Sequence, residues 1–253
     1  MQQDMRRDDS SVRGSTNQTR RAYGLIRSLI RSGFLVDDEQ LVEDRLVKTM
    51  GIPRARVREA LQQLAADGLV ERRRRTGTRV RQEYFQVPVD DILPWHTPPG
   101  FAVRQTDNRV VPSGPSIRTR LGTHDTRVGL VEHVFEHVTS SGVEPLGVRM
   151  AYYRERYEQP KVWQRCPSLA DAFALVYGVP LGKVDTVIDA VACDTDTARV
   201  LGLREGSPVL MREQLLRDVE GTVQEYTFSY YRADRVSFPL GTAPERVEAV
   251  TRT

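Results

Sequence analysis

The sequence predicts an α+β protein with two domains, a small helical domain that ends in a hairpin and a larger domain with an antiparallel sheet. Its 253 residues are enough for two modest domains. Apolar residues recur at helical spacing in the first third and often alternate in the remainder. Residues 1–81 hold 18 Arg and Lys against 11 Asp and Glu, whereas residues 82–253 hold 19 against 23. A basic part therefore precedes an acidic part, which indicates that only the first part faces a polyanion.

The composition excludes several classes of protein. With 39% hydrophobic and 28% charged residues, the chain has the balance of an ordinary globular protein. No apolar run reaches the length of a membrane span, and residues 1–19 lack an apolar signal core, so we expect a cytoplasmic protein. Cys166 and Cys193 have no CxxC or Cys/His spacing, and the four histidines form no ligand set. We therefore expect no disulfide, no metal and no cofactor.

Four segments are predicted along the chain. Residues 1–18 are polar and are expected to form a disordered tail. Residues 19–81 form the basic first domain. Residues 82–112 contain five prolines and are expected to be a linker that packs on one of the domains, with one short strand. Residues 113–250 form the second domain.

Residues 51–69 predict a helix with a cationic first turn. The turn Gly51-Ile52-Pro53 precedes it, since proline at a helix entrance loses no hydrogen bond, and Asp67-Gly68 ends it. Cationic and apolar residues divide between its two sides, with Arg54, Arg56 and Arg58 outward and Val57, Ala60, Leu61 and Leu64 inward. Two helices are expected before it, one from Thr19 with Ala22, Ile26, Leu29 and Ile30 inward, and one over roughly Gln40 to Met50.

A basic hairpin is predicted after this helix. Leu69-Val70-Glu71 starts a strand, Arg72 to Arg75 lead into the turn Thr76-Gly77-Thr78, and Arg79-Val80-Arg81 returns. Three helices followed by such a hairpin make a winged helix-turn-helix. A run of four arginines is also compatible with a merely solvated surface. Like charges at a hairpin tip beside a cationic helix repel one another. Binding to DNA explains better why they are gathered there.

The outward edges of this helix predict different roles for its polar residues. Arg58 and Gln62 lie at i and i+4 on one edge, so both are expected to point into a major groove. Arg56 lies on the other edge and is expected to contact phosphate or to pair with Glu59 at i+3. An acid facing DNA is repelled, so Glu59 is expected to orient an arginine.

The second domain reads as an antiparallel sheet with short helices. Strands are expected over Val128 to Val138, Leu146 to Tyr152 and Val184 to Val191, with a hairpin of Val209 to Arg217 and Thr222 to Arg232. Ser168 caps a predicted helix that ends at Gly178, and Asp194 caps another that ends at Gly202.

The first domain resembles the DNA-binding domain of GntR-family transcriptional regulators over about Arg20 to Arg81. The resemblance is carried by LVEDRLV (41–47), GIPRARVREAL (51–61), DGLV (67–70) and GTRV (77–80). It implies that Arg54 and Arg58 contact operator bases or phosphates and that Gly77 lies at a wing tip in the minor groove. The family usually has Ser or Thr at Pro53, and often Arg at Asp44, so the base preference is not transferable. The DNA-binding candidates are Arg45, Arg54, Arg56, Arg58, Gln62, Arg74, Arg75, Thr76, Gly77 and Thr78.

The second domain resembles the UTRA domain of the HutC subfamily of these regulators. The resemblance is carried by the order of elements, by GSPVL (206–210) and by EYTFSYYRADR (225–235). It implies a fold like chorismate lyase with a pocket for a small effector, with Glu225 and Tyr231 where family members contact ligand. The alternative is that Tyr230 and Tyr231 are ordinary strand aromatics and that Arg232 and Asp234 form a structural pair.

One departure restricts the effector. Family members that bind sugar phosphates carry Arg-x-Arg before an Ala-Asp-Gly turn, where this chain has EHVTSSG at 136–142. A buried phosphate needs charged donors, so we expect an effector other than a sugar phosphate. His133, His137 and Arg149 are further candidates for the pocket, although a lone histidine is more often a packed residue than a ligand group.

These observations predict a homodimeric, sequence-specific transcriptional regulator that is not an enzyme. It is expected to be a repressor that a small molecule releases from an inverted-repeat operator in double-stranded DNA. One alternative is a DNA-binding plasmid-maintenance or architectural regulator whose second domain only dimerises. Another is a lyase-like enzyme, for which the sequence shows no nucleophile–base set.

Overall fold

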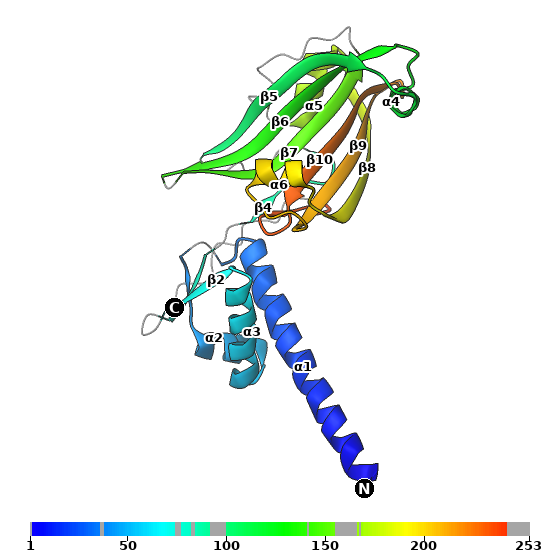
Figure 1. Ribbon diagram of the computed structural model, residues 1–253. Helices are drawn as coiled ribbons and strands as arrows, with labels where there is room; N and C mark the ends of the chain where they lie inside the picture. Colours follow the sequence, from blue (N-terminus) through cyan, green and yellow to red (C-terminus); the bar gives the residue numbers. More distant parts are fainter. Residues whose placement is uncertain are drawn as a thin grey trace. The chain divides into compact units, whose positions relative to one another are not determined.

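The computed structural model describes residues 2–35, 38–73, 77–81, 84–91, 100–140, 142–154, 166 and 168–241, except the side chains of 2–16 and 73. The chain divides into two compact units, the first reaching Tyr84 and the second beginning at Phe85 (Figure 1). The predicted α+β class with two domains is confirmed. The boundary lies well before the predicted start of the second domain at Ser113.

The first unit is a three-helix domain with a small sheet. Its elements are α1 (Gln2–Arg31), β1 (Gln40–Leu41), α2 (Glu43–Met50), α3 (Arg54–Ala66), β2 (Val70–Arg73) and β3 (Gly77–Val80). The strands are antiparallel in the order β1-β3-β2. The helices enclose a core of Ala22, Ile26, Ile30, Leu46, Val57, Ala60, Leu61 and Leu64. The predicted winged helix-turn-helix is confirmed.

Two helix boundaries of the first unit differ from the prediction. The structure continues α1 back to Gln2, so the expected tail at 1–18 and the helix start at Thr19 are wrong. A nucleated helix gains one hydrogen bond for each residue it adds, so a polar composition alone does not end it. The second helix begins at Glu43 and not at Gln40, because Gln40 and Leu41 pair with β3 as a third strand of the wing sheet.

The second unit is a six-stranded antiparallel sheet built from two strand–helix–hairpin repeats. The first repeat is β5 (Phe101–Pro112), α4 (Pro115–Leu121), β6 (Arg127–Thr139) and β7 (Gly142–Arg154). The second is β8 (Leu181–Ala192), α6 (Thr195–Leu201), β9 (Pro208–Asp218) and β10 (Val223–Arg232). The order β5-β6-β7-β10-β9-β8 brings β7 and β10 together at the centre (Figure 1).

The helices cover opposite faces of this sheet (Figure 1). The segment α5 (Leu169–Tyr177) packs on one face together with β4 (Phe85–Gln86), which pairs with β11 (Val236–Ser237). Helices α4 and α6 pack on the other face. The predicted caps are confirmed, since the Ser168 hydroxyl and the Asp194 carboxylate accept from helix N–H groups and Gly178 and Gly202 end the helices with positive φ.

The predicted linker at 82–112 is largely wrong. Residues 101–112 form the edge strand β5, and Phe85 and Val87 are buried in the core under α5. Four of the five prolines precede β5 in the sequence, and the fifth, Pro112, is its last residue, where an edge strand tolerates a missing N–H. The expectation that this segment packs on a domain with a short strand is confirmed by β4.

Candidate DNA-binding surface and effector pocket

Helix α3 presents one polar edge to solvent. Arg54, Arg58 and Gln62 are exposed and lie at successive i, i+4 positions on one side of the helix. The opposite side is fully buried through Val57 and Leu61. A helix held by one face and carrying forked donors on the other is suited to a major groove.

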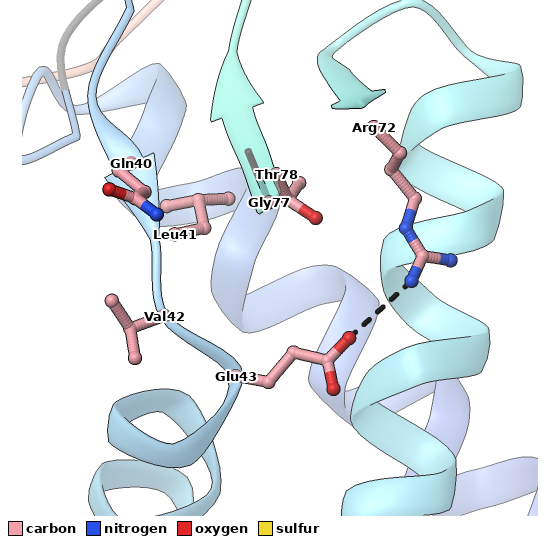
Figure 2. Close-up of a pocket in the computed structure, with 7 residues that line it drawn as sticks. All are labelled: Gln40, Leu41, Val42, Glu43, Arg72, Gly77 and Thr78. Atoms are coloured by element: carbon pink, nitrogen blue, oxygen red, sulfur yellow. Dashed lines mark hydrogen bonds and ion pairs between the residues drawn. The ribbon is translucent and has the colours of Figure 1, made fainter. Parts of the chain in front are cut away.

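Acidic side chains of α2 form ion pairs with these arginines. Arg54 forms an ion pair with Asp44, and Arg58 Nε lies 2.7 Å from Glu43 Oε2. Glu43 also accepts from Arg72 of the wing at 3.4 Å, so one carboxylate joins the recognition helix to the wing (Figure 2). The hydrogen bond with Glu43 raises the pKa of Arg58. The sequence did not identify Glu43 and Asp44 as partners, because they lie 15 and 10 residues away.

Arg56 lies on a different edge of α3 and belongs to a structural network. Its Nη1 is 2.6 Å from Glu59 Oε1, and the other oxygen of Glu59 accepts from Thr19 of α1 at 2.7 Å. These two hydrogen bonds lower the pKa of Glu59. The predicted pairing of Arg56 with Glu59 is confirmed, and the network joins α3 to α1.

Strand β3 of the wing begins at a glycine that the backbone requires. Gly77 has a φ of 88°, and a Cβ there would lie 3.1 Å from Gln40 Nε2. Thr78, a predicted DNA-binding residue, lies opposite Leu41 of β1 (Figure 2), and it is only 4% exposed. Arg45 is exposed on α2. Arg74, Arg75 and Thr76 lie outside the described residues.

Three of the predicted effector residues meet under α5. Arg149 of β7 and Glu225 of β10 form a buried ion pair, and the Tyr177 hydroxyl donates to Glu225 Oε2 at 2.7 Å. His133 of β6 is the register partner of Arg149. Burial, with a smaller effect from the Arg149 charge, lowers the pKa of His133 to about 3, so its ring is neutral near pH 7. Tyr177 was missed, because sequence gives no sign that α5 lies over β10.

The other two predicted effector residues lie apart from that pair. Tyr231 is buried and its hydroxyl accepts from Arg212 Nη2 at 2.7 Å. Arg212 of β9 is fully buried and was not predicted, because its neighbours along the strand do not show that a cation faces inward. His137 does not join the cluster. Its ring packs edge-on against Phe85, with centroids 5.0 Å apart.

The alternative structural reading of the final motif also holds in part. Arg232 Nη2 lies 2.7 Å from Asp234 Oδ2, as expected for a structural pair. The same guanidinium contacts Glu144 of β7 at 3.1 Å. Arg232 therefore fixes the end of β10 against β7.

Comparison with protein families decides the identity of both units. The model described as "Bacterial regulatory proteins, gntR family" matches residues 18–80. The model of the UTRA domain matches residues 146–237. This chain belongs to the GntR family of transcriptional regulators and carries a UTRA domain. The regulator thus joins a DNA-binding unit to an effector-binding unit.

Relatives match most of the regulator. It is 25% identical over 228 residues to the HTH-type transcriptional repressor NagR of Bacillus subtilis, covering 84% of this chain and 89% of NagR. It is 26% identical over 257 residues to the HTH-type transcriptional regulator Rv0792c of Mycobacterium tuberculosis, covering 94% and 88%.

Solved structures share the fold. The crystal structure of PhnF from Mycobacterium smegmatis has a TM-score of 0.55 at 20% identity, covering 88% of this chain and 99% of PhnF. The possible transcriptional regulator YydK from Bacillus subtilis has a TM-score of 0.50 at 17% identity, covering 89% and 99%. In the described part of the chain, no helix is long and apolar enough to cross a membrane.

Proposed function

We propose that the regulator is a cytoplasmic homodimeric repressor of the HutC subfamily that binds an inverted-repeat operator and leaves it when a small molecule binds the UTRA domain. The exposed edge of α3 carries this proposal, because Arg54, Arg58 and Gln62 are donors that match major-groove acceptors. Protein two-fold symmetry would match operator symmetry. NagR, which is named a repressor, supports repression over activation.

The DNA-binding arginines have partners that phosphate and bases can replace. Exposed ion pairs contribute little to stability, so exchanging Glu43 or Asp44 for a DNA acceptor costs little. Glu43 and Asp44 then lie near the duplex and oppose weak, nonspecific contacts. Only a sequence that satisfies the arginine forks would offset that repulsion.

We also propose that the UTRA unit binds ligand without transforming it. A base or acid works best when its pKa lies near the working pH, and the pKa of about 3 makes His133 a poor proton carrier near pH 7. The buried Glu225 is held by Arg149 and Tyr177. His133 and Glu225 are therefore suited to bind and orient a ligand, which we expect to be other than a sugar phosphate.

Footprinting on the DNA upstream of the regulator's own gene tests the proposal. The expected result is protection of a sequence with two-fold symmetry, lost as salt increases because phosphate contacts release counter-ions. A metabolite suggested by neighbouring genes is expected to remove the protection. Uniform, sequence-independent protection would contradict the proposal.

A further inference from the structure

A row of polar side chains crosses four strands of the UTRA sheet under α5. His133 of β6 pairs in register with Arg149 of β7, Arg149 with Ser229 of β10, and Ser229 with Arg212 of β9. Directly opposed residues in antiparallel strands point to the same face. With neighbouring strands about 4.8 Å apart, the Cα atoms of Arg149 and Arg212 lie about 10 Å apart with Ser229 between them.

Four donors in this row and the row beside it lack a partner within the described part of the chain. They are Arg149 Nε, Arg212 Nε, Ser229 Oγ and Thr227 Oγ1, all buried. Thr227 lies two residues before Ser229 on the same face of β10. Buried polar groups in native proteins are almost always hydrogen-bonded, so four unsatisfied donors in one patch indicate a ligand that accepts from them.

The charges of the patch favour an anion. Arg149 is neutralised by Glu225, whereas Arg212 is bonded to neutral oxygens, the carbonyls of Pro88, Val89 and Asp91 and the hydroxyl of Tyr231. The Asp91 carboxylate also attracts Arg212, and its Oδ1 accepts from the N–H of Leu169 at 3.2 Å. No carboxylate among the described residues forms an ion pair with Arg212. Burial of such an arginine is costly, so a ligand anion would stabilise it.

We propose that Arg149, Arg212, Ser229 and Thr227 bind the carboxylate of a small organic monocarboxylate, which is the class of effector. This inference rests on the proposed effector role of the UTRA unit. One negative charge neutralises Arg212, whereas the second charge of a phosphate dianion would be repelled by Glu225. The apolar part of the ligand would pack on Val131, Phe135 and Ala151, which lie on the same face in the neighbouring rows.

Acceptors on the same face fit the rest of such a ligand. Gln214 Oε1 and Gln105 Oε1 are buried without a partner among the described residues. Gln105 is the register partner of His133, and Gln214 that of Thr227. A hydroxyl or amine on the ligand would donate to either oxygen.

The proposed site is connected to the segment that follows the DNA-binding unit. Arg212 Nη1 donates to the carbonyls of Pro88 and Val89 at 3.2 and 3.4 Å, and Gln214 Nε2 donates to Val89 at 3.2 Å. Residues 85–91 directly follow Tyr84, the last residue of the first unit in that part of the chain. A ligand carboxylate at Arg212 Nε would bind the same guanidinium as these carbonyls. Occupancy of the site would therefore change how residues 85–91 are held.

Acetate is the probe that tests the site, because it is small enough to enter wherever a larger carboxylate enters. The Nε–H signals of Arg149 and Arg212 in the full-length protein are followed by ¹H–¹⁵N NMR at constant ionic strength. Acetate is expected to shift both signals, and the neutral isostere acetamide neither. The double variant Ser229→Ala, Thr227→Val is expected to weaken acetate binding at least about tenfold, since it removes two hydrogen bonds to a charge. Thr139→Val, at the far end of β6, is the control and leaves the affinity unchanged.

Three outcomes overturn the monocarboxylate site: no shift with acetate, equal shifts with acetamide, or unchanged affinity in the double variant. Inorganic phosphate binding more tightly than acetate would overturn the preference for a monoanion. Operator binding is measured on the same samples. Operator protection without an acetate response removes this inference alone, whereas an acetate response without operator protection removes only the proposed function.

Discussion

The regulator carries two sets of arginines whose surroundings differ. The side chains of Arg54 and Arg58 in the DNA-binding unit are 55% and 57% exposed, and their carboxylate partners come from a neighbouring helix. Arg149 and Glu225 in the UTRA unit are 5% and 6% exposed. An exposed pair contributes about 0–1 kcal/mol, whereas removing one partner of a buried pair costs about 3–5 kcal/mol. In the proposed function, the first set exchanges its acceptors for DNA, and the second set stays fixed and shapes the proposed ligand site.

The largest expected effect is the loss of one partner of the buried pair. Glu225→Gln leaves Arg149 charged and buried, so the free energy of unfolding is expected to fall by about 3–5 kcal/mol. Urea denaturation, followed by a tyrosine signal of the UTRA unit, measures this change. Asp185→Asn removes a half-exposed partner of Lys183 and Arg217 and is the matched control, with a change below about 1 kcal/mol. Equal changes in the two variants would remove the contrast between the two arginine sets.

The pH dependence of stability reports on the buried row. The pKa of His133 is about 3 in the folded protein and about 6.5 in the unfolded chain, so the unfolded chain binds an extra proton between these values. Stability is therefore expected to fall by about 1.4 kcal/mol per pH unit as pH falls below about 6.5. His133→Gln removes this contribution, whereas the exposed His124→Gln keeps it. Urea midpoints near pH 7 and near pH 5 measure this change. An equal fall in midpoint between the two pH values for wild type and His133→Gln would show that His133 is not held neutral.

The two edges of α3 are expected to differ in DNA binding. Arg54→Ala removes an exposed fork and is expected to weaken operator binding by about 1–3 kcal/mol. Arg56→Ala breaks the contact with Glu59 and is expected to lower the stability of the first unit more than its affinity for DNA. Fluorescence anisotropy with the footprinted operator, alongside thermal unfolding, separates the two effects. The interpretation of α3 fails if Arg56→Ala has the larger effect on DNA affinity.

The smallest expected effect on stability comes from the acidic partners. Glu43→Gln with Asp44→Asn changes the free energy of unfolding by less than about 1 kcal/mol, since both ion pairs are exposed. The same change removes two negative charges beside the duplex and is expected to tighten nonspecific DNA binding several-fold at low salt. Binding to unrelated DNA at two salt concentrations measures this. Weaker nonspecific binding would mean that the acids orient the arginines for phosphate and do not compete with it.

Local sequence signals predicted much of the architecture. The arginine-bearing helix, the wing hairpin and the capped helices α5 and α6 follow from turn glycines, capping residues and apolar periodicity, which act within a few positions. Strand β5 was missed because prolines dominate the segment before it, although none interrupts the strand between Phe101 and Val111. The opposite error concerns residues 2–18, which were predicted as a disordered tail and form part of α1. Helix propagation there does not depend on an apolar stripe.

Residues of the candidate sites were predicted only where the signal lies within a single helix or strand. The exposure of Arg54, Arg58 and Gln62 follows from helical spacing, and the pairing of Arg56 with Glu59 from an i+3 separation. The acids that hold Arg54 and Arg58 depend on how α2 packs on α3. Arg212, Ser229 and Thr227 depend on the register of β9 and β10 and on the carbonyls of residues 88–91, more than 120 positions from Arg212.

Direct comparison of specific and nonspecific DNA affinity in Arg58→Ala tests the account most directly. Arg199→Ala is the matched control, because Arg199 is an exposed arginine paired with an acid, Asp196, on a helix of the other unit. Arg58→Ala is expected to weaken binding to the footprinted operator by about 1–3 kcal/mol, with a much smaller loss on unrelated DNA, while Arg199→Ala binds both as wild type does. Equal losses on operator and unrelated DNA would contradict the claim that the exposed edge of α3 reads a sequence.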